Sequence, residues 1–235
     1  LTGGAMVLGV SLWRLYRFAG VDSEAFRASA KIGAVTVLIA AAAVALTGDR
    51  QAKVMTEVQP MKMAAAEALY DSKSTAGFSI FTVGTLEGKE EVWSARIPGL
   101  LSYLGKGDFN ARIDGINDVQ SAYEAKYGPG NYTPNVPLTY WTFRLMIGVG
   151  MSSALAALWV LWAFTRGRMP RSIWCGRLAL LLPLTPLLGN SFGWIFTEMG
   201  RQPWIVFGLM PTAAGVSPGV STAEVLISMI GFTLV

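Results

Sequence analysis

Residues 140–164 read YWTFRLMIGVGMSSALAALWVLWAF, and Arg144 is the only charged residue among them. A single helix crosses a bilayer with about 17–25 mostly apolar residues, so this run is long enough to span. Two further runs have the same character: residues 32–47 are uncharged, and residues 173–196 contain Arg177 as their only charged residue. The sequence therefore predicts an all-α fold, a polytopic bundle of transmembrane helices.

The composition agrees with this prediction. Of the 235 residues, 52% are hydrophobic and 14% are charged, whereas a soluble domain carries about a quarter charged residues. Residues 1–12 and 226–235 are also apolar, but each run is too short to cross a membrane. We therefore expect three complete spans with a partial one at each end, as in an internal segment of a longer membrane protein.

The charged residues predict how the spans are oriented. The two short connections at residues 13–31 and 165–177 hold eight basic and two acidic residues. Positive residues collect in cytoplasmic loops, so this face is expected to be cytoplasmic and no nucleic-acid partner is predicted. The segment 49–139 holds nine basic and eleven acidic residues. This balance places it outside, together with the segment 197–222.

Two residue types are scarce enough to exclude several kinds of site. The chain has no histidine and a single cysteine, Cys175. A disulfide framework, a zinc or iron–sulfur site built on Cys/His clusters and a Ser-His-Asp active site are therefore excluded. A haem held by two histidines of this chain is excluded as well.

These patterns divide the chain into three parts. Residues 1–48 form two helices, the first of them partial, with their cytoplasmic connection. Residues 49–139 form a long external loop, and residues 140–235 form the remaining helices, the last of them partial. Loops of this length usually have a function, so the external loop is a candidate binding region.

The external loop is expected to begin with a helix over VQPMKMAAAEALYDSK, residues 58–73. Pro60 suits the first helical position, where its missing N–H costs nothing. Apolar residues then recur at helical spacing and give one apolar face. The run FSIFTV at residues 78–83 favours a strand and is followed by an acidic turn. The glycine- and proline-rich run at residues 127–137 is expected to be an irregular tether back to the membrane.

Lys62 and Glu67 lie on the expected loop helix, flanking its apolar face without pairing. Solvated charges on an external helix are the ordinary interpretation. The alternative is a polar pair that hydrogen-bonds the two oxygens of a quinol head group, in which the carboxylate takes the proton released on oxidation.

Met146 and Arg144 lie near the outer end of the span at residues 140–164. Met146 is either a packing methionine or a thioether ligand to haem iron, since methionine ligation suits an electron-transfer haem. Arg144 either extends its side chain to the interface or binds an anion such as a haem propionate or a lipid phosphate.

A third group of candidates lies in FTEMGRQPW, residues 196–204, directly after a span. Glu198 and Arg201 form either an ordinary interfacial pair or a site in which the carboxylate ligates a high-spin iron and the arginine neutralises propionates. Trp194 precedes Glu198 by four residues on the same helix face. It is either an interfacial aromatic residue or a tryptophan between two redox centres.

Three segments, in this order, resemble subunit I of the bacterial cytochrome bd-type quinol oxidases. They are VQPMKMAAAEA at residues 58–68, YTPNV leading to YWTFRLM at residues 132–146, and EMGRQPW at residues 198–204. The last is the most specific of the three. The resemblance covers essentially the whole chain, and the loop at 49–139 is similar to a short form of the family's quinol-oxidising loop.

The resemblance implies specific roles for these candidates. Met146 would be an axial ligand of a low-spin haem b, with Arg144 beside that haem, and Glu198 would be the axial ligand of a high-spin haem b. Arg201 and Trp194 would lie near the haem cluster, and the resemblance assigns the binding and oxidation of quinol to Lys62 and Glu67.

The resemblance also implies an activity and partners. The complex would oxidise ubiquinol or menaquinol at the outer face of the bacterial plasma membrane and reduce O2 to water. It would contain haem d, a subunit II and small single-span subunits. The family's histidine ligands are absent here, so we expect them upstream of this segment.

Two other functions remain alternatives. A secondary transporter or channel subunit would use Arg144, Asn190 and Glu198 to line a polar path, with a helix broken at Pro183 and Pro186. A purely structural membrane subunit would dock partners through the external loop.

Overall fold

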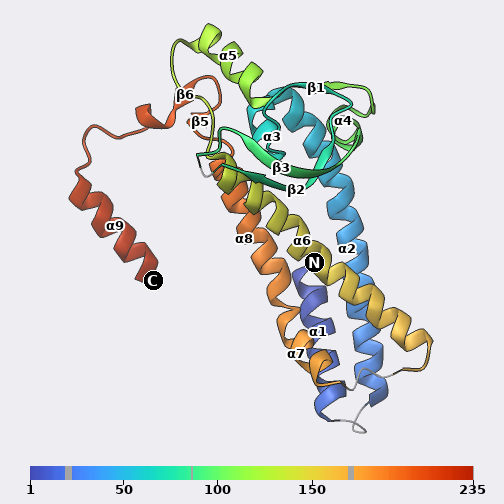
Figure 1. Cartoon of the computed structure of the whole chain (residues 1–235). Helices are drawn as coiled ribbons and strands as arrows, with labels where there is room; N and C mark the ends of the chain where they lie inside the picture. The colour runs from blue at the N-terminus through green and yellow to red at the C-terminus, as the bar shows by residue number, and fades with distance from the viewer. Residues whose placement is uncertain (19–22, 86, 169–171, 235) are drawn as a thin grey trace.

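The computed structural model describes residues 1–18, 23–85, 87–168 and 172–234. Asp22 and Arg171, which enter the charge balance of the connections, and Val235, at the end of the last expected helix, lie outside these ranges. Five helices form an elongated bundle (Figure 1). They are α1 (Thr2–Arg17), α2 (Ser23–Val58), α6 (Val136–Thr165), α7 (Ile173–Leu181) and α8 (Leu184–Met199).

The expected spans correspond to these helices. Two helices, α2 and α6, are each long and apolar enough to cross a membrane, and α7 with α8 forms a third span bent by 42°. The break falls at Pro183, which has no N–H to continue the hydrogen-bond ladder of α7. Asn135 caps the start of α6, because its side-chain oxygen accepts a hydrogen bond from the Leu138 amide at 3.0 Å. The predicted membrane helical bundle is thus confirmed.

Small residues allow α1 and α2 to pack closely. Ala5, Ala30 and Ala34 are fully buried between the two helices with Leu8. A Cβ atom at Gly33 would lie only 2.7 Å from the Leu8 backbone nitrogen. Small residues at such a crossing let two helix backbones approach, which is the usual way helices associate in a membrane.

The residues between α2 and α6 fold over one end of the bundle. This cap contains α3 (Pro60–Ala66), α4 (Leu100–Lys106) and α5 (Ile116–Tyr127). An antiparallel hairpin joins β2 (Phe78–Gly84) to β3 (Glu91–Ile97), and β1 (Lys73–Ser74) pairs with β4 (Arg112–Ile113). The expected strand over residues 78–83 is confirmed by β2. In Figure 1 the hairpin lies across the end of the bundle where α6 begins.

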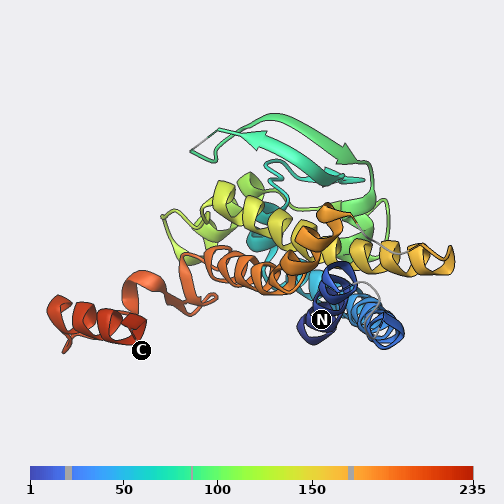
Figure 2. The same ribbon diagram turned by 90° about the horizontal axis from the view of Figure 1, so that it is seen from below.

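The last part of the chain leads away from the bundle. A short ladder pairs β5 (Trp204–Val206) with β6 (Met210–Pro211), followed by η1 (Thr212–Ala214) and α9 (Thr222–Leu234). Figure 2 shows α9 standing apart from the other helices. All residues of α9 are exposed.

The cap differs from the expected loop in two respects. Helix α2 continues through Val58, past Asp49, where the external loop was expected to start. Helix α3 ends at Ala66 and not near Lys73, because the backbone turns at Glu67 and Ala68 has a positive φ of 45°. The predicted proline at the start of this helix is confirmed.

Candidate functional site

The centre of the candidate site is a buried ion pair between the cap and α6. The Arg144 Nη2 atom lies 2.7 Å from Oε2 of Glu67, and the two side chains are 10% and 1% exposed. Glu67 is the C-cap residue of α3, and its Oε2 also accepts a hydrogen bond from the Ser79 amide at 2.9 Å. The pair therefore joins α3, β2 and α6.

Aromatic rings surround the Arg144 guanidinium. Its central carbon lies 4.6 Å from the ring centre of Phe78, 4.9 Å from that of Tyr140 and 5.1 Å from that of Phe143. Such cation–π contacts favour a desolvated cation. Within the described part of the chain, the buried Nε and Nη1 atoms of Arg144 have no hydrogen-bond partner. Buried donors of this kind normally have an acceptor, so the guanidinium has capacity for a further anion.

Hydroxyl groups extend the network from Glu67. The Ser79 hydroxyl lies 2.8 Å from the Tyr140 hydroxyl and 2.7 Å from the Thr82 hydroxyl. All three residues are at most 2% exposed. The Arg96 guanidinium also contacts this turn, because it donates hydrogen bonds to the backbone carbonyl oxygens of Glu67 at 3.1 Å and Ala68 at 2.9 Å.

Complete burial raises the pKa of the Glu67 carboxyl above its ordinary value, because water no longer stabilises the carboxylate. The nearby Arg144 and the Ser79 amide act in the opposite direction, and Arg96 adds a weaker effect of the same sign. A carboxyl group with a raised pKa is a better proton acceptor than an ordinary glutamate. The expectation of a solvated charge at this position is therefore wrong.

Lys62 turns towards α8 and not towards Glu67. Its Nζ donates to the Thr197 carbonyl oxygen at 3.3 Å and lies 5.0 Å from the ring centre of Phe196. Burial and the positive charge of Arg201 lower the pKa of Lys62, against an opposing effect of Glu198. Lys62 and Glu67 thus start from the same short helix and contact different spans.

Met146 lies on α6 where this helix contacts α8, and it is half-buried. Two glycines of α8 face it. A Cβ atom at Gly193 would lie 3.0 Å from the Met146 sulfur, and one at Gly189 would lie 3.7 Å from the Met146 carbonyl oxygen. The thioether is therefore accommodated against the backbone of the neighbouring span.

The third group of candidates lies at the end of α8. Glu198 and Arg201 form an ion pair, and their side chains are 45% and 35% exposed. Trp194 is 62% exposed and does not belong to the packed interior of the described residues. The structure therefore brings Glu198 and Arg201 together and leaves Trp194 on the surface of α8.

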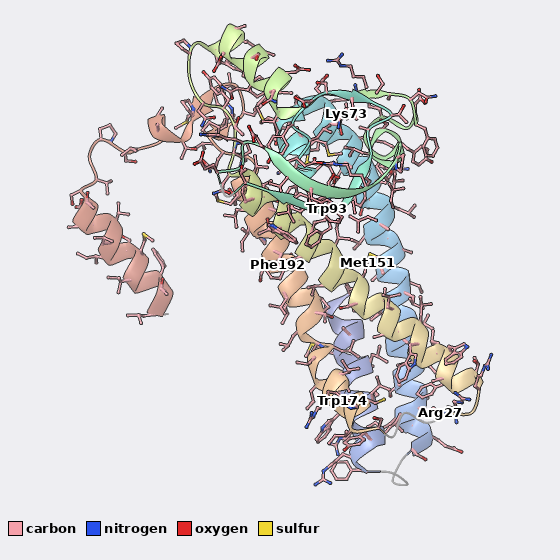
Figure 3. The ribbon with its side chains drawn as sticks, viewed as in Figure 1. Arg27, Lys73, Trp93, Met151, Trp174 and Phe192 are labelled. Carbon is pink, nitrogen blue, oxygen red and sulfur yellow. The ribbon has the colours of Figure 1, made fainter. Side chains whose placement is uncertain are left out.

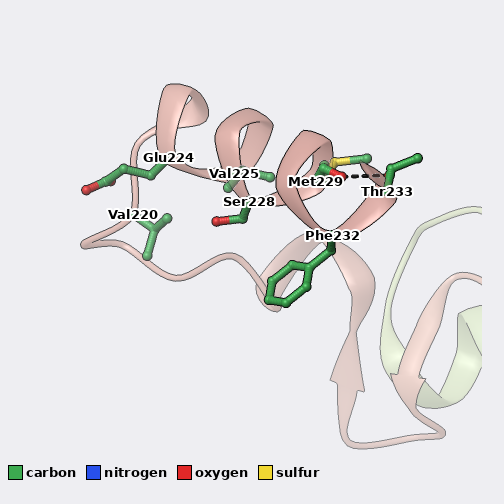
Figure 4. Close-up of a pocket in the computed structure, with 7 residues that line it drawn as sticks. All are labelled: Val220, Glu224, Val225, Ser228, Met229, Phe232 and Thr233. Atoms are coloured by element: carbon green, nitrogen blue, oxygen red, sulfur yellow. Dashed lines mark hydrogen bonds between the residues drawn. The ribbon is translucent and has the colours of Figure 1, made fainter. Parts of the chain in front are cut away.

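Two concave regions lie outside the ion pair. One runs along the exposed α9, where Glu224, Ser228 and Phe232 line an open surface (Figure 4). The other is a small cavity beside Lys62 and Arg201, lined by Tyr123 and Trp204 among others. Burial raises the pKa of Tyr123 to about 12. Among the described residues no group of three or more His, Cys, Asp or Glu side chains could hold a metal ion.

Sequence reasoning found Glu67 and Arg144 separately and missed their contact. It also missed Ser79, Tyr140 and Phe78, which hold the pair in place. The only signal was two polar residues, Ser79 and Thr82, inside an otherwise apolar strand.

Comparison with known proteins gives a consistent result over the whole chain. Residues 1–235 match the family model for cytochrome bd terminal oxidase subunit I. The chain is 40% identical over 232 residues to cytochrome bd ubiquinol oxidase subunit 1 of Bacillus subtilis (strain 168), covering 98% of this chain and 49% of that protein. It is 29% identical over 250 residues to a putative cytochrome bd menaquinol oxidase subunit I of the same strain, covering 100% of this chain and 51% of that protein.

The fold is also similar to a solved structure, the bd oxidase from Geobacillus thermodenitrificans. The TM-score is 0.76 at 28% sequence identity, and the match covers 99% of this chain and 52% of the other. The chain thus spans about half the length of the relatives that it matches. These similarities support an oxidase subunit and not the transporter or structural alternatives.

Proposed function

The chain belongs to the cytochrome bd terminal oxidase subunit I family, and from this premise we propose that it takes part in quinol oxidation and haem binding within a membrane quinol:oxygen oxidoreductase. The observation that carries the proposal is the buried Glu67–Arg144 pair. It connects the cap, where quinol would bind, to α6 two residues before Met146.

The residues present fit a haem group. Arg144 has buried N–H groups without a partner among the described residues, and a haem propionate is an anionic acceptor. Met146 would ligate the low-spin haem b and Glu198 the high-spin haem b, with Arg201 and Trp194 near the haem cluster. When bound, the two b haems and haem d would transfer electrons singly and reduce O2. Histidine ligands would come from outside these residues, because this chain has none.

Lys62 and Glu67 would act on quinol. A quinol loses two protons and two electrons when it is oxidised to the quinone. The Glu67 carboxylate, whose pKa is raised by burial, would accept a proton from one hydroxyl group of the quinol. Lys62 would hydrogen-bond the other oxygen, whose proton would pass to water at the outer face, and Arg144 would hold the Glu67 carboxylate in place.

The same proposal includes location and partners. The cap would lie on the outer side of the bacterial plasma membrane, so that protons from quinol are released there. The complex would contain a subunit II and small single-span subunits. One relative is named a ubiquinol oxidase and another a menaquinol oxidase, so either quinol is compatible with the family.

A reduced-minus-oxidised absorption spectrum of the full-length complex in detergent tests the haem ligand. Met146→Leu should selectively remove or shift the low-spin haem b band. Met151→Leu is the matched control, because Met151 lies on the same helix and is 56% exposed (Figure 3). If Met146→Leu left the spectrum unchanged, Met146 would be a packing residue and not a haem ligand. A complex without haem absorption would overturn the oxidase proposal.

A further inference from the structure

In the middle of the β2–β3 hairpin, polar side chains lie on the inner face and apolar side chains lie on the outer face. Val83 pairs with Trp93 and Phe81 pairs with Ala95, so these four side chains share one face. Phe81, Val83 and Trp93 on this face are 43%, 41% and 57% exposed. A sheet that faces water has the opposite arrangement.

The inner face of the hairpin holds the polar side chains. Thr82 pairs with Ser94, and Ser79 pairs with Arg96. A register shift between Ser79 and Phe81 inserts Ile80, so that Ser79 and Thr82 both turn inward although they are three residues apart. The Ser79 amide, the Ser79 hydroxyl and the Arg96 guanidinium make the hydrogen bonds to the Glu67 carboxylate, to Tyr140 and to the backbone that are described above.

The outer face is continuous with the exposed apolar surface of α6. The ring centre of Phe81 lies 5.0 Å from that of Trp141 and 6.3 Å from that of Trp93. Trp141 and Leu145 are exposed on α6, one turn apart, and α6 is long and apolar enough to cross a membrane. In Figure 3 Trp93 lies close to the end of the bundle.

We propose that the face formed by Phe81, Val83 and Trp93 rests in the lipid bilayer, at the boundary between head groups and acyl chains. Tryptophan is enriched at this depth because its ring is apolar and its N–H is polar. The charged residues of the hairpin turn, among them the Glu87–Lys89 ion pair at 2.8 Å, remain in water. The hairpin then shields the buried Glu67–Arg144 pair from the lipid.

Collision rates of a spin label test this placement in the full-length complex, reconstituted in lipid nanodiscs. The label is attached at Val83→Cys or Trp93→Cys in a background that carries Cys175→Ser. Phe109→Cys is the matched control, because Phe109 is 53% exposed and stacks on Tyr103 in the cap. The Val83 variant keeps Trp93, so the test does not depend on removing the tryptophan.

At positions 83 and 93 the label should collide several-fold more often with O2, relative to a water-soluble nickel chelate, than at position 109. Frequent collision with the nickel chelate at 83 and 93 would show that this face is in water. Low collision rates with both reagents would show that protein covers it. Either result would overturn the proposal, whatever the oxidase activity.

Discussion

Two buried interfaces of this molecule have opposite chemistry. The α1–α2 interface is dry and built from small apolar residues, with Gly33 against Leu8. The junction of α3, β2 and α6 buries Glu67, Arg144 and the Ser79 hydroxyl. The first depends on shape, and the second depends on the pairing of the Glu67 carboxylate with Arg144 and with the Ser79 amide.

This difference determines how each interface should respond to substitution. A change of shape at the dry interface has a cost that grows with the added volume. The loss of one partner at the polar junction leaves the other charged or polar group unpaired and away from water. Loss of a charged partner at the polar junction should therefore have the largest effect, and loss of a neutral hydroxyl group whose neighbour keeps another partner should have the smallest.

The largest effect is expected for Glu67→Ala. It leaves the buried Arg144 cation without its carboxylate, and breaking a buried pair in this way costs about 3–5 kcal/mol. The measurement is the thermal unfolding of the purified complex. Glu57→Ala, at an exposed glutamate of α2, is the control and should change little. A double variant, Glu67→Leu with Arg144→Leu, should recover part of the lost stability. If Glu67→Ala lost no more stability than Glu57→Ala, the ion pair would not stabilise the junction.

A smaller effect is expected for Gly33→Ala at the dry interface. The new Cβ would lie 2.7 Å from the Leu8 nitrogen, so α1 and α2 must separate, and overpacking of this kind costs about 1–3 kcal/mol. Gly48→Ala is the matched control on α2, because nothing lies within 4 Å of its added Cβ. The control should be neutral or stabilising by up to about 1 kcal/mol. Equal unfolding temperatures for the two variants would contradict the close packing.

The pH dependence of quinol oxidation tests the raised pKa of Glu67. Only the carboxylate accepts a proton, so the rate should fall as the pH drops through this pKa, by about tenfold per pH unit below it. Because burial raises the pKa, the fall should begin above the range of an ordinary glutamate. The raised pKa of Glu67 also stabilises the folded state at pH values below the pKa that Glu67 has in the unfolded chain. This stabilisation is lost as the pH rises through the pKa that Glu67 has in the folded state. An unchanged pH profile in Glu67→Gln would show that another group accepts the proton.

The sequence was sufficient to predict the spans, because hydropathy over about 20 residues depends on local composition alone. It also predicted the strand at β2 and the proline at the start of α3. It could not predict where α3 ends, since the turn at Glu67 depends on contacts with Ser79 and Arg144 from other parts of the chain.

The candidate site was predicted residue by residue but not as an arrangement. Glu67 and Arg144 are 77 positions apart by their residue numbers, and no periodicity connects them. The inward turn of Ser79 and Thr82 depends on the register shift at Ile80, which is a property of the pairing with β3. Such features follow from tertiary contacts, and two polar residues inside an apolar strand are too weak a signal to predict them.

The smallest effect is expected for Tyr140→Phe. The substitution keeps the ring that contacts Arg144 at 4.9 Å and removes only the hydroxyl group, which lies 2.8 Å from the Ser79 hydroxyl. Ser79 keeps Thr82 as a partner at 2.7 Å, so no group is left unpaired and the loss should be about 0.5–1.5 kcal/mol. Thermal unfolding measures it beside Tyr103→Phe, at an exposed tyrosine of α4. If Tyr140→Phe lost as much stability as Glu67→Ala, the chain of hydroxyl groups, and not the ion pair, would hold the junction together. If it unfolded like Tyr103→Phe, the stabilising network would be limited to Glu67, Arg144 and the Ser79 amide.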